Sequence, residues 1–312
     1  MTLKETLNLF GSKSEPFFFC ISYDMTKWEV IKLSELPKSI EYEMDNSLDK
    51  SSKVTLEKDY ISSENYQMQF NQIQNEILNG NTYLTNLTTS TKIKINSSLK
   101  DLYNIANAKF KLFFKDEFIC FSPERFIKCT NNKIFTYPMK GTIDANIPNA
   151  KQIILDNKKE LAEHTMAVDL LRNDLSIVSK NVKVTKFRYC DTINAGNKKL
   201  IQVSSEISGN LNSSWKSEIG DILTSLLPAG SITGTPKKET IKIIDKIETH
   251  KREFFTGIFG VFDGTNLDSS VMIRFIQKDK NNNLVYKSGG GITCDSNIDN
   301  EYQEMIDKVY IP

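Results

Sequence analysis

Acidic side chains recur at helical spacing in two distant parts of the chain. Glu160 and Glu163 stand three residues apart in the segment 157–179, and Glu301 and Glu304 repeat that spacing near the last residues. Residues at positions i and i+3 share one face of a helix. Four carboxylates on two helices suit a hard divalent cation, because Mg²⁺ selects oxygen ligands. The same spacing is common on solvated helix surfaces, so a solvated face stays open as the alternative.

Two segments could offer main-chain N–H groups to an anion. Residues 228–237 include Thr233 and lead through Pro236 into a predicted helix, whose N-terminal N–H groups and dipole favour negative charge. Their spacing differs from that of a phosphate-binding P-loop. The glycine run 289–291 would let a ligand approach the backbone closely. Taken separately, each segment is more typical of a tight turn.

Lysine, histidine and cysteine supply the remaining candidates for chemistry. Lys140 ends a predicted strand, where a lysine is by default a surface charge. The only two histidines, His164 and His250, argue against a histidine-based zinc site. The five cysteines lie at no metal-ligand or redox spacing, so we expect reduced thiols in a cytoplasmic protein.

The composition is that of a globular protein. Of 312 residues, 39% are hydrophobic and 25% are charged, and 40 basic residues against 39 acidic ones leave a net charge of +1. This balance gives no electrostatic basis for binding nucleic acid or an anionic membrane. No apolar stretch approaches the ~20 residues that span a bilayer, and no signal-peptide core is present. We therefore expect neither partner.

Hydrophobic periodicity predicts an α+β fold. Helical patterns cover residues 66–77, 157–179, 215–227 and 299–309, and Pro236 is placed to open a further helix. Strand patterns cover residues 16–23, 28–33, 111–142, 257–262, 271–277 and 284–288, with a turn at 263–266 and a polar loop over 45–58. Strands joined by short turns, without a βαβα alternation, indicate antiparallel sheets with helices packed outside them.

Eight segments together resemble one family, the chorismate-binding enzymes. In chain order they are NGNTYLTNLT, FSPERF, YPMKGT, KELAEHTMAVDLLRNDL, LLPAGSITGTPK, GIFGVF, VMIRF and GGGITCDSNIDNEYQE. The family includes anthranilate synthase component I, aminodeoxychorismate synthase component I, and the isochorismate and salicylate synthases. The resemblance covers residues 65–312 as the family core, after a shortened N-terminal part over residues 1–60. It implies one catalytic domain, 1–312, with two stacked, mainly antiparallel sheets flanked by helices in four layers.

The resemblance also implies a set of ligand contacts. Mg²⁺ would bind the four glutamates at positions 160, 163, 301 and 304 and would hold the ring carboxylate of chorismate. Arg274 matches a residue that binds the pyruvyl carboxylate through a charge-assisted contact. The other substrate contacts would come from Gly141, Thr142, Thr233, Gly289, Gly290, Gly291 and Lys308.

Two residues would carry the reaction itself. Glu124 matches the general acid that protonates the C4 hydroxyl as it departs, because hydroxide is a poor leaving group. Burial, or the nearby carboxylates, would raise the pKa of Glu124 so that it is protonated near neutral pH. Lys140 stands where aminodeoxychorismate synthases carry lysine and the anthranilate and isochorismate synthases usually carry alanine. A neutral Lys140 would add at C2, and ammonia would then attack C4 and expel it.

Lys140 therefore favours a subunit that makes 4-amino-4-deoxychorismate for p-aminobenzoate and folate synthesis. The alternatives are anthranilate synthase component I, then isochorismate synthase, and more remotely a catalytically silent chorismate-binding partner protein. No cysteine has the surroundings of a glutaminase nucleophile, so ammonia would come from a separate glutamine amidotransferase subunit or from free ammonium. The segment Phe17–Cys20 does not match the tryptophan-site segment of anthranilate synthases, which argues against feedback by tryptophan.

Overall fold

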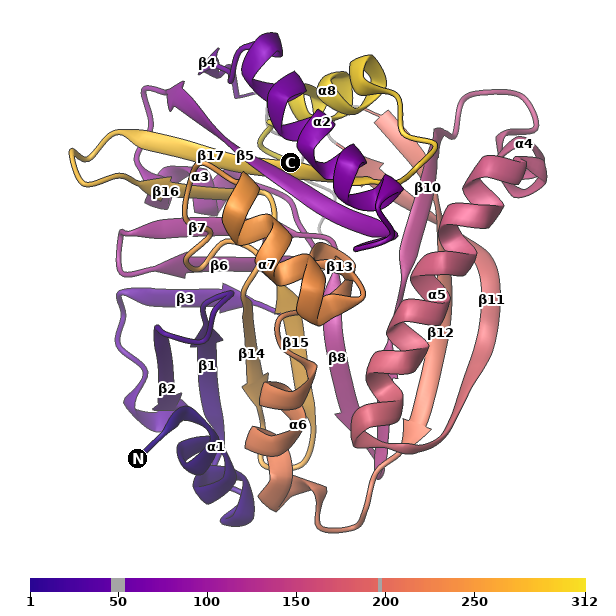
Figure 1. Cartoon of the computed structure of the whole chain (residues 1–312). Coiled ribbons are helices and arrows are strands. Elements are labelled where there is room, and N and C mark those ends of the chain that lie inside the picture. The colour runs from indigo at the N-terminus through magenta and orange to yellow at the C-terminus, as the bar shows by residue number, and fades with distance from the viewer. Residues whose placement is uncertain (46–53, 196–197) are drawn as a thin grey trace.

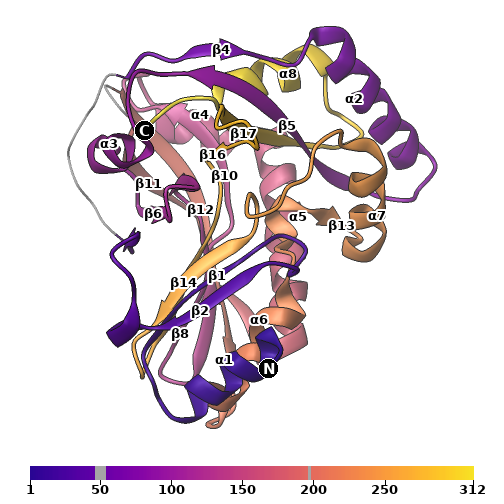
Figure 2. The ribbon, with the colours of Figure 1, turned by 90° about the vertical axis from the view of Figure 1, so that its left-hand side faces the viewer.

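Two antiparallel sheets form the centre of the structure. The computed structural model describes residues 1–45, 54–195 and 198–312. In Figure 1 the strands of one sheet run down the lower half and the right-hand side of the molecule, and those of the other run across its upper left. Helices cover the outer faces, as the turned view in Figure 2 also shows. The predicted α+β architecture is confirmed.

The first sheet has nine strands. Their order is β10-β12-β9-β8-β15-β14-β1-β2, and β11 pairs with β12 outside this path. The bounds are β1 (Phe17–Ile21), β2 (Trp28–Lys32), β8 (Arg125–Thr130), β9 (Lys133–Thr136), β10 (Met139–Asp144), β11 (Lys180–Ala195), β12 (Lys198–Asn210), β14 (Ile258–Phe262) and β15 (Leu267–Val271).

The second sheet has eight strands. Their order is β13-β5-β17-β16-β7-β6-β3, and β4 pairs with β5. The bounds are β3 (Ile40–Glu43), β4 (Glu57–Asp59), β5 (Leu84–Lys94), β6 (Phe110–Phe114), β7 (Phe118–Ser122), β13 (Gly234–Thr235), β16 (Phe275–Lys278) and β17 (Leu284–Ile292).

Helices pack on each sheet from outside. Helices α1, α5 and α6 share an apolar cluster with the first sheet, and α2, α7 and α8 share one with the second. The bounds are α1 (Leu3–Ser12), α2 (Ser63–Leu78), α3 (Leu99–Ile105), α4 (Ala150–Asp156), α5 (Lys158–Val178), α6 (Ile219–Leu226), α7 (Lys237–Ile247) and α8 (Ile298–Asp307). Within the described ranges, no helix is both long and apolar enough to cross a membrane.

Strand β1 shows how the sequence builds these layers. All five of its residues are buried, because a strand between two apolar layers needs apolar side chains on both faces. Phe17 and Phe19 point to the cluster beneath α1 and α6. Phe18 and Cys20 point to the cluster between the two sheets. The side chains of Phe17–Cys20, the segment compared with the tryptophan site of anthranilate synthases, therefore belong to the apolar core.

Two of the passages from one sheet to the other lie next to each other. Strand β7 leads into β8 through Pro123 and Glu124, and β15 leads into β16 through residues 272–274. The two passages are hydrogen-bonded to each other, because Phe121 N donates to Arg274 O at 3.2 Å and Val271 N donates to Glu124 O at 3.2 Å. Glu124 and Arg274 therefore lie at one junction between the sheets.

Most of the expected elements are confirmed, with one clear error. The prediction of a single strand over 271–277 is wrong, because β15 ends at Val271 and the chain changes sheets before β16 begins. Arg274, with φ at +53°, breaks the extended conformation there. The turn over 263–266 does join two strands, β14 and β15. Of the predicted polar loop, residues 46–53 lie outside the described part, and Glu57–Asp59 form β4.

Candidate active site

A cavity of about 260 Å³ lies at the junction of the two sheets. It is bordered by the β7–β8 and β15–β16 passages, β10, β17, α8 and the loop before β13. Nine residues singled out from the sequence line it: Glu124, Lys140, Gly141, Thr142, Arg274, Gly289, Gly291, Glu304 and Lys308. The lining does not include the other five, which are Glu160, Glu163, Thr233, Gly290 and Glu301. Segments far apart in the sequence thus meet as the resemblance implied.

Glu124 faces this cavity with a raised pKa. Burial raises the pKa of Glu124, while a hydrogen bond from the Ser231 hydroxyl and the positive charges of Lys140, Arg274 and Lys308 act against that rise. The expected direction of the shift is therefore confirmed, and burial is its cause. The suggested contribution of neighbouring carboxylates to this rise is not confirmed, because the charges that act on Glu124 come from Lys140, Arg274 and Lys308. A carboxylic acid whose pKa is raised by burial is suited to act as a general acid.

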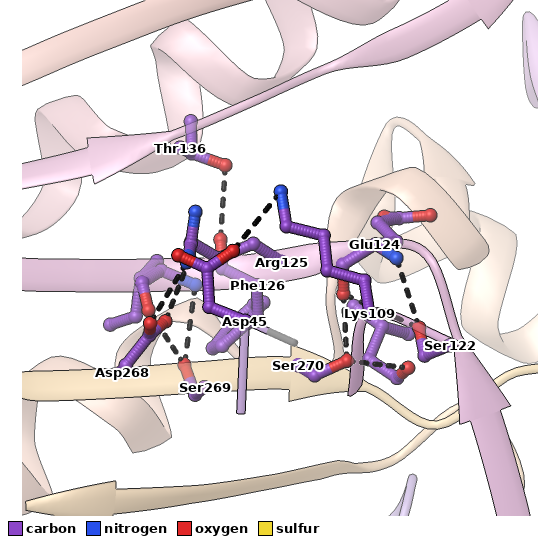
Figure 3. A network of polar contacts seen from close by, with 12 residues as sticks. Asp45, Lys109, Ser122, Glu124, Arg125, Phe126, Thr136, Asp268, Ser269 and Ser270 are labelled. Carbon is purple, nitrogen blue, oxygen red and sulfur yellow. Dashed lines mark hydrogen bonds and ion pairs between the residues drawn. The ribbon is translucent and has the colours of Figure 1, made fainter. Parts of the chain in front are cut away.

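The backbone of Glu124 is fixed by its neighbours in both sheets. Ser270 Oγ donates to Glu124 O at 2.8 Å, and Glu124 N donates to Ser122 Oγ at 3.1 Å. The next residue, Arg125, binds both carboxylate oxygens of Asp268 at 2.7 and 3.0 Å and also contacts Asp45 at 2.8 Å. Figure 3 shows these contacts surrounding the start of β8. The acid is thus held on a rigid strand end.

Lys140 projects from β10 into the same cavity. A Cβ built on Gly291 would stand 3.7 Å from Lys140 Nζ, so the ammonium group lies beside the glycine run of β17. Within the described parts of the chain, no hydrogen bond or ion pair engages Nζ. A lysine facing a cavity without a partner is available to a ligand.

Arg274 brings a second cationic group to the cavity. Its guanidinium lies over the ring of Tyr310, 5.4 Å from the centroid, and its Nε is buried without a hydrogen-bond partner in the described structure. A buried donor without a partner costs free energy, which a bound carboxylate would recover. The arrangement supports the implied role of Arg274 as a carboxylate-binding residue.

The glycine run lies in a strand with one open edge. Strand β16 pairs with β17 only as far as Lys287, whereas β5 pairs with β17 as far as Ile292. Among the described residues, 288–292 therefore have a strand partner only on the β5 side. Lys308 Nζ donates to Gly289 O at 2.8 Å there. This free edge fits the expectation that Gly289, Gly290 and Gly291 contribute backbone groups to a ligand.

The four glutamates come from α5 and α8. A Cβ on Gly141 would stand 2.8 Å from Glu160 Oε2, and a Cβ on Gly290 would stand 3.4 Å from Glu301 Oε2 and 3.8 Å from Glu304 Oε1. Burial raises the pKa of Glu160, and the charges of Glu163 and Glu304 add to that rise. The acidic side chains of the two helices therefore face one another across the edge of the cavity.

Their donor chemistry fits a hard cation, although their oxygens are not gathered around one point. Within residues 1–45, 54–195 and 198–312, no group of three or more acidic, histidine or cysteine side chains is close enough to hold a metal ion. Three of the acids have other partners: Glu301 accepts from Ser296 Oγ at 2.8 Å, Glu304 pairs with Lys308 at 2.6 Å, and Glu163 pairs with Lys159 at 3.7 Å. A cation would relieve the repulsion between the carboxylates and compete with these contacts.

Thr233 does not line the cavity. It is fully buried, and its hydroxyl donates to Ala229 O at 2.8 Å, so it does not line the cavity as expected. Ser231, two residues earlier, faces the cavity and binds Glu124 instead. Thr142 does line the cavity, with its hydroxyl donating to Gln202 at 2.9 Å. Sequence reasoning missed Ser231, Gln202, Asn86 and Lys287, because none stands in a spacing that marks it as functional.

A larger cavity of about 1010 Å³ adjoins the first. The two share lining residues from the β7–β8 passage, β10, β12, the β15–β16 passage and α8: Pro123, Met139, Thr142, Gln202, Arg274, Glu304 and Lys308. The two cavities therefore adjoin each other, and Lys140 and Glu124 line the smaller one.

Comparisons with known proteins agree with this geometry. A relative described as an uncharacterized PabA-like protein, from Haemophilus influenzae, is 44% identical over 99% of this chain and 95% of its own length. Aminodeoxychorismate synthase component 1 of Escherichia coli is 34% identical over 82% of this chain and 59% of its own length. The crystal structure of anthranilate synthase component I from Streptococcus pneumoniae matches with a TM-score of 0.69 at 27% identity, over 84% of this chain and 60% of that one.

The family described as chorismate binding enzyme matches residues 18–311, which includes every residue assigned to the site. This span also includes β1 and β2, which precede the segments that carried the resemblance. The chain therefore belongs to the chorismate-binding enzymes.

Proposed function

We propose that this protein is the chorismate-aminating subunit of aminodeoxychorismate synthase, which converts chorismate and ammonia into 4-amino-4-deoxychorismate and water. The observation that carries the proposal is Lys140, which faces the cavity alongside the acid Glu124 and whose Nζ has no partner among the residues that the structure describes. The 34% identity to a protein named aminodeoxychorismate synthase component 1 supports it.

In the first half of the proposed reaction, Lys140 displaces water from the ring. Its neutral amine adds at C2, the ring π electrons shift, and the C4–O bond breaks. Glu124 gives its proton to the departing oxygen, so water leaves rather than hydroxide. Glu124 is suited to this step because burial raises its pKa.

In the second half, ammonia replaces the lysine. Ammonia adds at C4, the π electrons shift back, and the C2–N bond breaks with its electron pair returning to Lys140. The ammonium group formed at C4 passes a proton to the Glu124 carboxylate, which restores the acid. Both residues end as they began, and the net change is loss of water and gain of an amino group.

The rest of the site would bind and orient the substrate. Arg274 would pair with the pyruvyl carboxylate, and the open edge of β17 would receive the ring carboxylate. The resident cation would be Mg²⁺, held by Glu160, Glu163, Glu301 and Glu304, and it would neutralise the ring carboxylate when bound. The donor set supports this assignment, because the two acidic helices face each other beside the cavity.

Ammonia would come from a glutamine amidotransferase subunit. The "component 1" in the name of the Escherichia coli relative supports a partner of this kind. Three of the five cysteines, Cys20, Cys120 and Cys129, are buried, and burial raises the pKa of each, which disfavours the thiolate that a glutaminase needs. The product would serve p-aminobenzoate and folate synthesis.

Anthranilate synthesis is the second candidate, because a solved structure of anthranilate synthase component I matches this chain. The two reactions share chorismate and ammonia but differ in the carbon that ammonia attacks. A nucleophile at Lys140 occupies C2 and so directs ammonia to C4. The products differ in mass and in chromatographic behaviour.

The deciding experiment measures the product made by the purified chain. With chorismate, Mg²⁺ and saturating ammonium, we expect 4-amino-4-deoxychorismate, and glutamine should replace ammonium only when an amidotransferase subunit is added. Lys140→Ala should slow turnover and divert product toward a C2 adduct or anthranilate. Lys140→Arg should not restore activity, because guanidinium stays protonated.

Lys151→Ala is the control, since that lysine lies on exposed α4 outside both cavities. It should match the unmodified chain in rate and product. The covalent role is wrong if Lys140→Ala still makes only 4-amino-4-deoxychorismate while Lys140→Arg keeps most of the activity. Anthranilate as the main product of the unmodified chain would instead favour the second candidate.

A further inference from the structure

Strand β10 is irregular at the position of Lys140. Its register against β12 shifts between Met139 and Thr142. Across that shift, the two residues Lys140 and Gly141 stand opposite a single residue of β12, Val203. Two residues opposite one make a β-bulge, which bends a strand and changes the direction of a side chain. Gly141 has φ at +87°, a conformation that favours glycine. Lys140 therefore projects into the cavity from a bulge.

The side chain of Gln202, on β12, spans this bulge. Its Nε2 donates to Gly141 O at 2.9 Å, and its Oε1 accepts from Thr142 Oγ1 at 2.9 Å. The same Nε2 donates at 3.4 Å to the carbonyl of Val203, the residue opposite the bulge. A carboxamide can make these contacts together because it carries both donors and an acceptor. One side chain thus ties the two residues that follow Lys140 to the neighbouring strand.

The chain before Lys140 is held in a different way. Ser205 N donates to Pro138 O at 3.0 Å, so the backbone of β12 holds this side of the bulge. Ser205 is itself fixed by α5, because its Oγ lies 2.7 Å from His164 Nε2. Lys140 is therefore held by the backbone on one side and by the Gln202 carboxamide on the other. The carboxamide contact can be removed by substitution without breaking the backbone contact.

The position of the Lys140 amine depends on this bulge. Its Nζ lies beside the glycine run of β17, 3.7 Å from a Cβ built on Gly291, and Glu124 lines the same cavity. Attack on a ring carbon requires the amine to approach to about 3–3.5 Å with its lone pair aligned. A bulge that can shift would move the amine out of this range.

We propose that Gln202 is a positioning residue for Lys140, and that its carboxamide holds the β10 bulge in the conformation that directs Nζ to C2 of the ring. The inference rests on the proposed function, in which Lys140 is the nucleophile. Direct contact with the substrate is the competing role, because Gln202 also lines the cavity. The two roles have different effects on KM and on the product.

Gln202→Met tests the proposal, because it keeps the length of the side chain and removes its donors and acceptor. With saturating ammonium, kcat should fall on the order of a hundredfold, the loss expected when a reacting group is misplaced by about 1 Å. KM for chorismate should stay near that of the unmodified chain, because Arg274 and the β17 edge are unchanged. The product should shift toward the C2 adduct or anthranilate, as in Lys140→Ala. The product ratio does not depend on the folded fraction, so a general loss of structure would not change it.

Hydrogen exchange of β10, measured without substrate, reports the bulge itself and should be faster in Gln202→Met than in the unmodified chain. Gln152→Met is the matched control. The amide of Gln152 donates to Asp156 on the exposed side of α4, a helix that also packs beside β10. This variant should leave the rate, the product ratio and the exchange of β10 unchanged.

Three results would overturn the role of Gln202. They are a raised KM with an unchanged product ratio, which would assign Gln202 to substrate binding, unchanged exchange of β10, and unchanged kcat and product despite faster exchange. Each of them leaves the proposed function standing, provided that the unmodified chain makes 4-amino-4-deoxychorismate. If the unmodified chain makes none, the proposed function fails, and the positioning of its nucleophile fails with it.

Discussion

The hydrogen bond from Ser231 to Glu124 leads to a prediction about pH. It favours the ionised form of the acid and so holds down a pKa that burial raises. Ser231→Ala removes that bond. A hydrogen bond to a charged group is worth about 1.5–3 kcal/mol, and 1.36 kcal/mol corresponds to one pKa unit. The general acid must be protonated to act, so activity is lost as pH rises through its pKa. The alkaline limb of the profile should therefore move upward by about one to two pH units.

The assay is kcat/KM against pH with saturating ammonium, because this quantity reports groups of the free enzyme. Ser270→Ala is the control, since Ser270 binds the backbone carbonyl of Glu124 and leaves its carboxylate alone. The midpoint pH of the alkaline limb in Ser270→Ala should equal that of the unmodified chain, even if the rate of the variant falls. An unchanged limb in Ser231→Ala, or one displaced to lower pH, would refute the assignment of Glu124 as the acid.

Two further predictions concern the acidic residues. Glu304→Gln should lower activity chiefly by raising the Mg²⁺ concentration needed for half-maximal rate. The control is Glu239→Gln, which breaks an exposed helix ion pair to Lys242 and should leave that concentration unchanged. Gly141→Ala should destabilise the fold by about 1–2 kcal/mol, because φ is +87° there, and should also weaken Mg²⁺ use by displacing Glu160. Gly80→Ala, at φ +75° with no atom near its Cβ, should cost similar stability in thermal unfolding without affecting Mg²⁺.

Secondary structure was predicted most accurately from the sequence where a hydrophobic pattern fits only one kind of element. The helical period over 157–179 gave α5 almost to its ends, and the apolar run near Phe17 gave a strand buried on both faces. The sequence was least informative where neighbouring elements were equally apolar. Val271 and Phe275 are both buried, so nothing in the pattern marked the change of sheet between them. The β11–β12 hairpin went unpredicted for the opposite reason, since its polar residues hide the strand alternation.

The site shows the same limit at the level of single residues. Spacing predicted that Glu160 and Glu163 share one helix face and that Glu301 and Glu304 share another, because helical periodicity places each pair together whatever the fold; their role as cation ligands stays a prediction. It could not distinguish Ser231 from Thr233, since the structured turn before β13 decides which hydroxyl faces the cavity. Which side chain in a turn reaches the ligand depends on backbone torsions that residue types do not report.

The position of the cavity follows from the way the sheets are connected. A chain that changes sheet must leave one hydrogen-bonded ladder before it joins the next, so the side chains of the residues between the strands can face the junction. Here two such passages run side by side, and they carry Glu124 and Arg274. Because each passage is fixed by paired strands on both sides, the acid and the guanidinium are held on rigid strand ends. Lys140 comes to this junction from β10 in the first sheet. The glycine run 289–291 of β17 comes to it from the second sheet. Substrate bound there would touch both sheets, so its binding should stabilise their junction against opening.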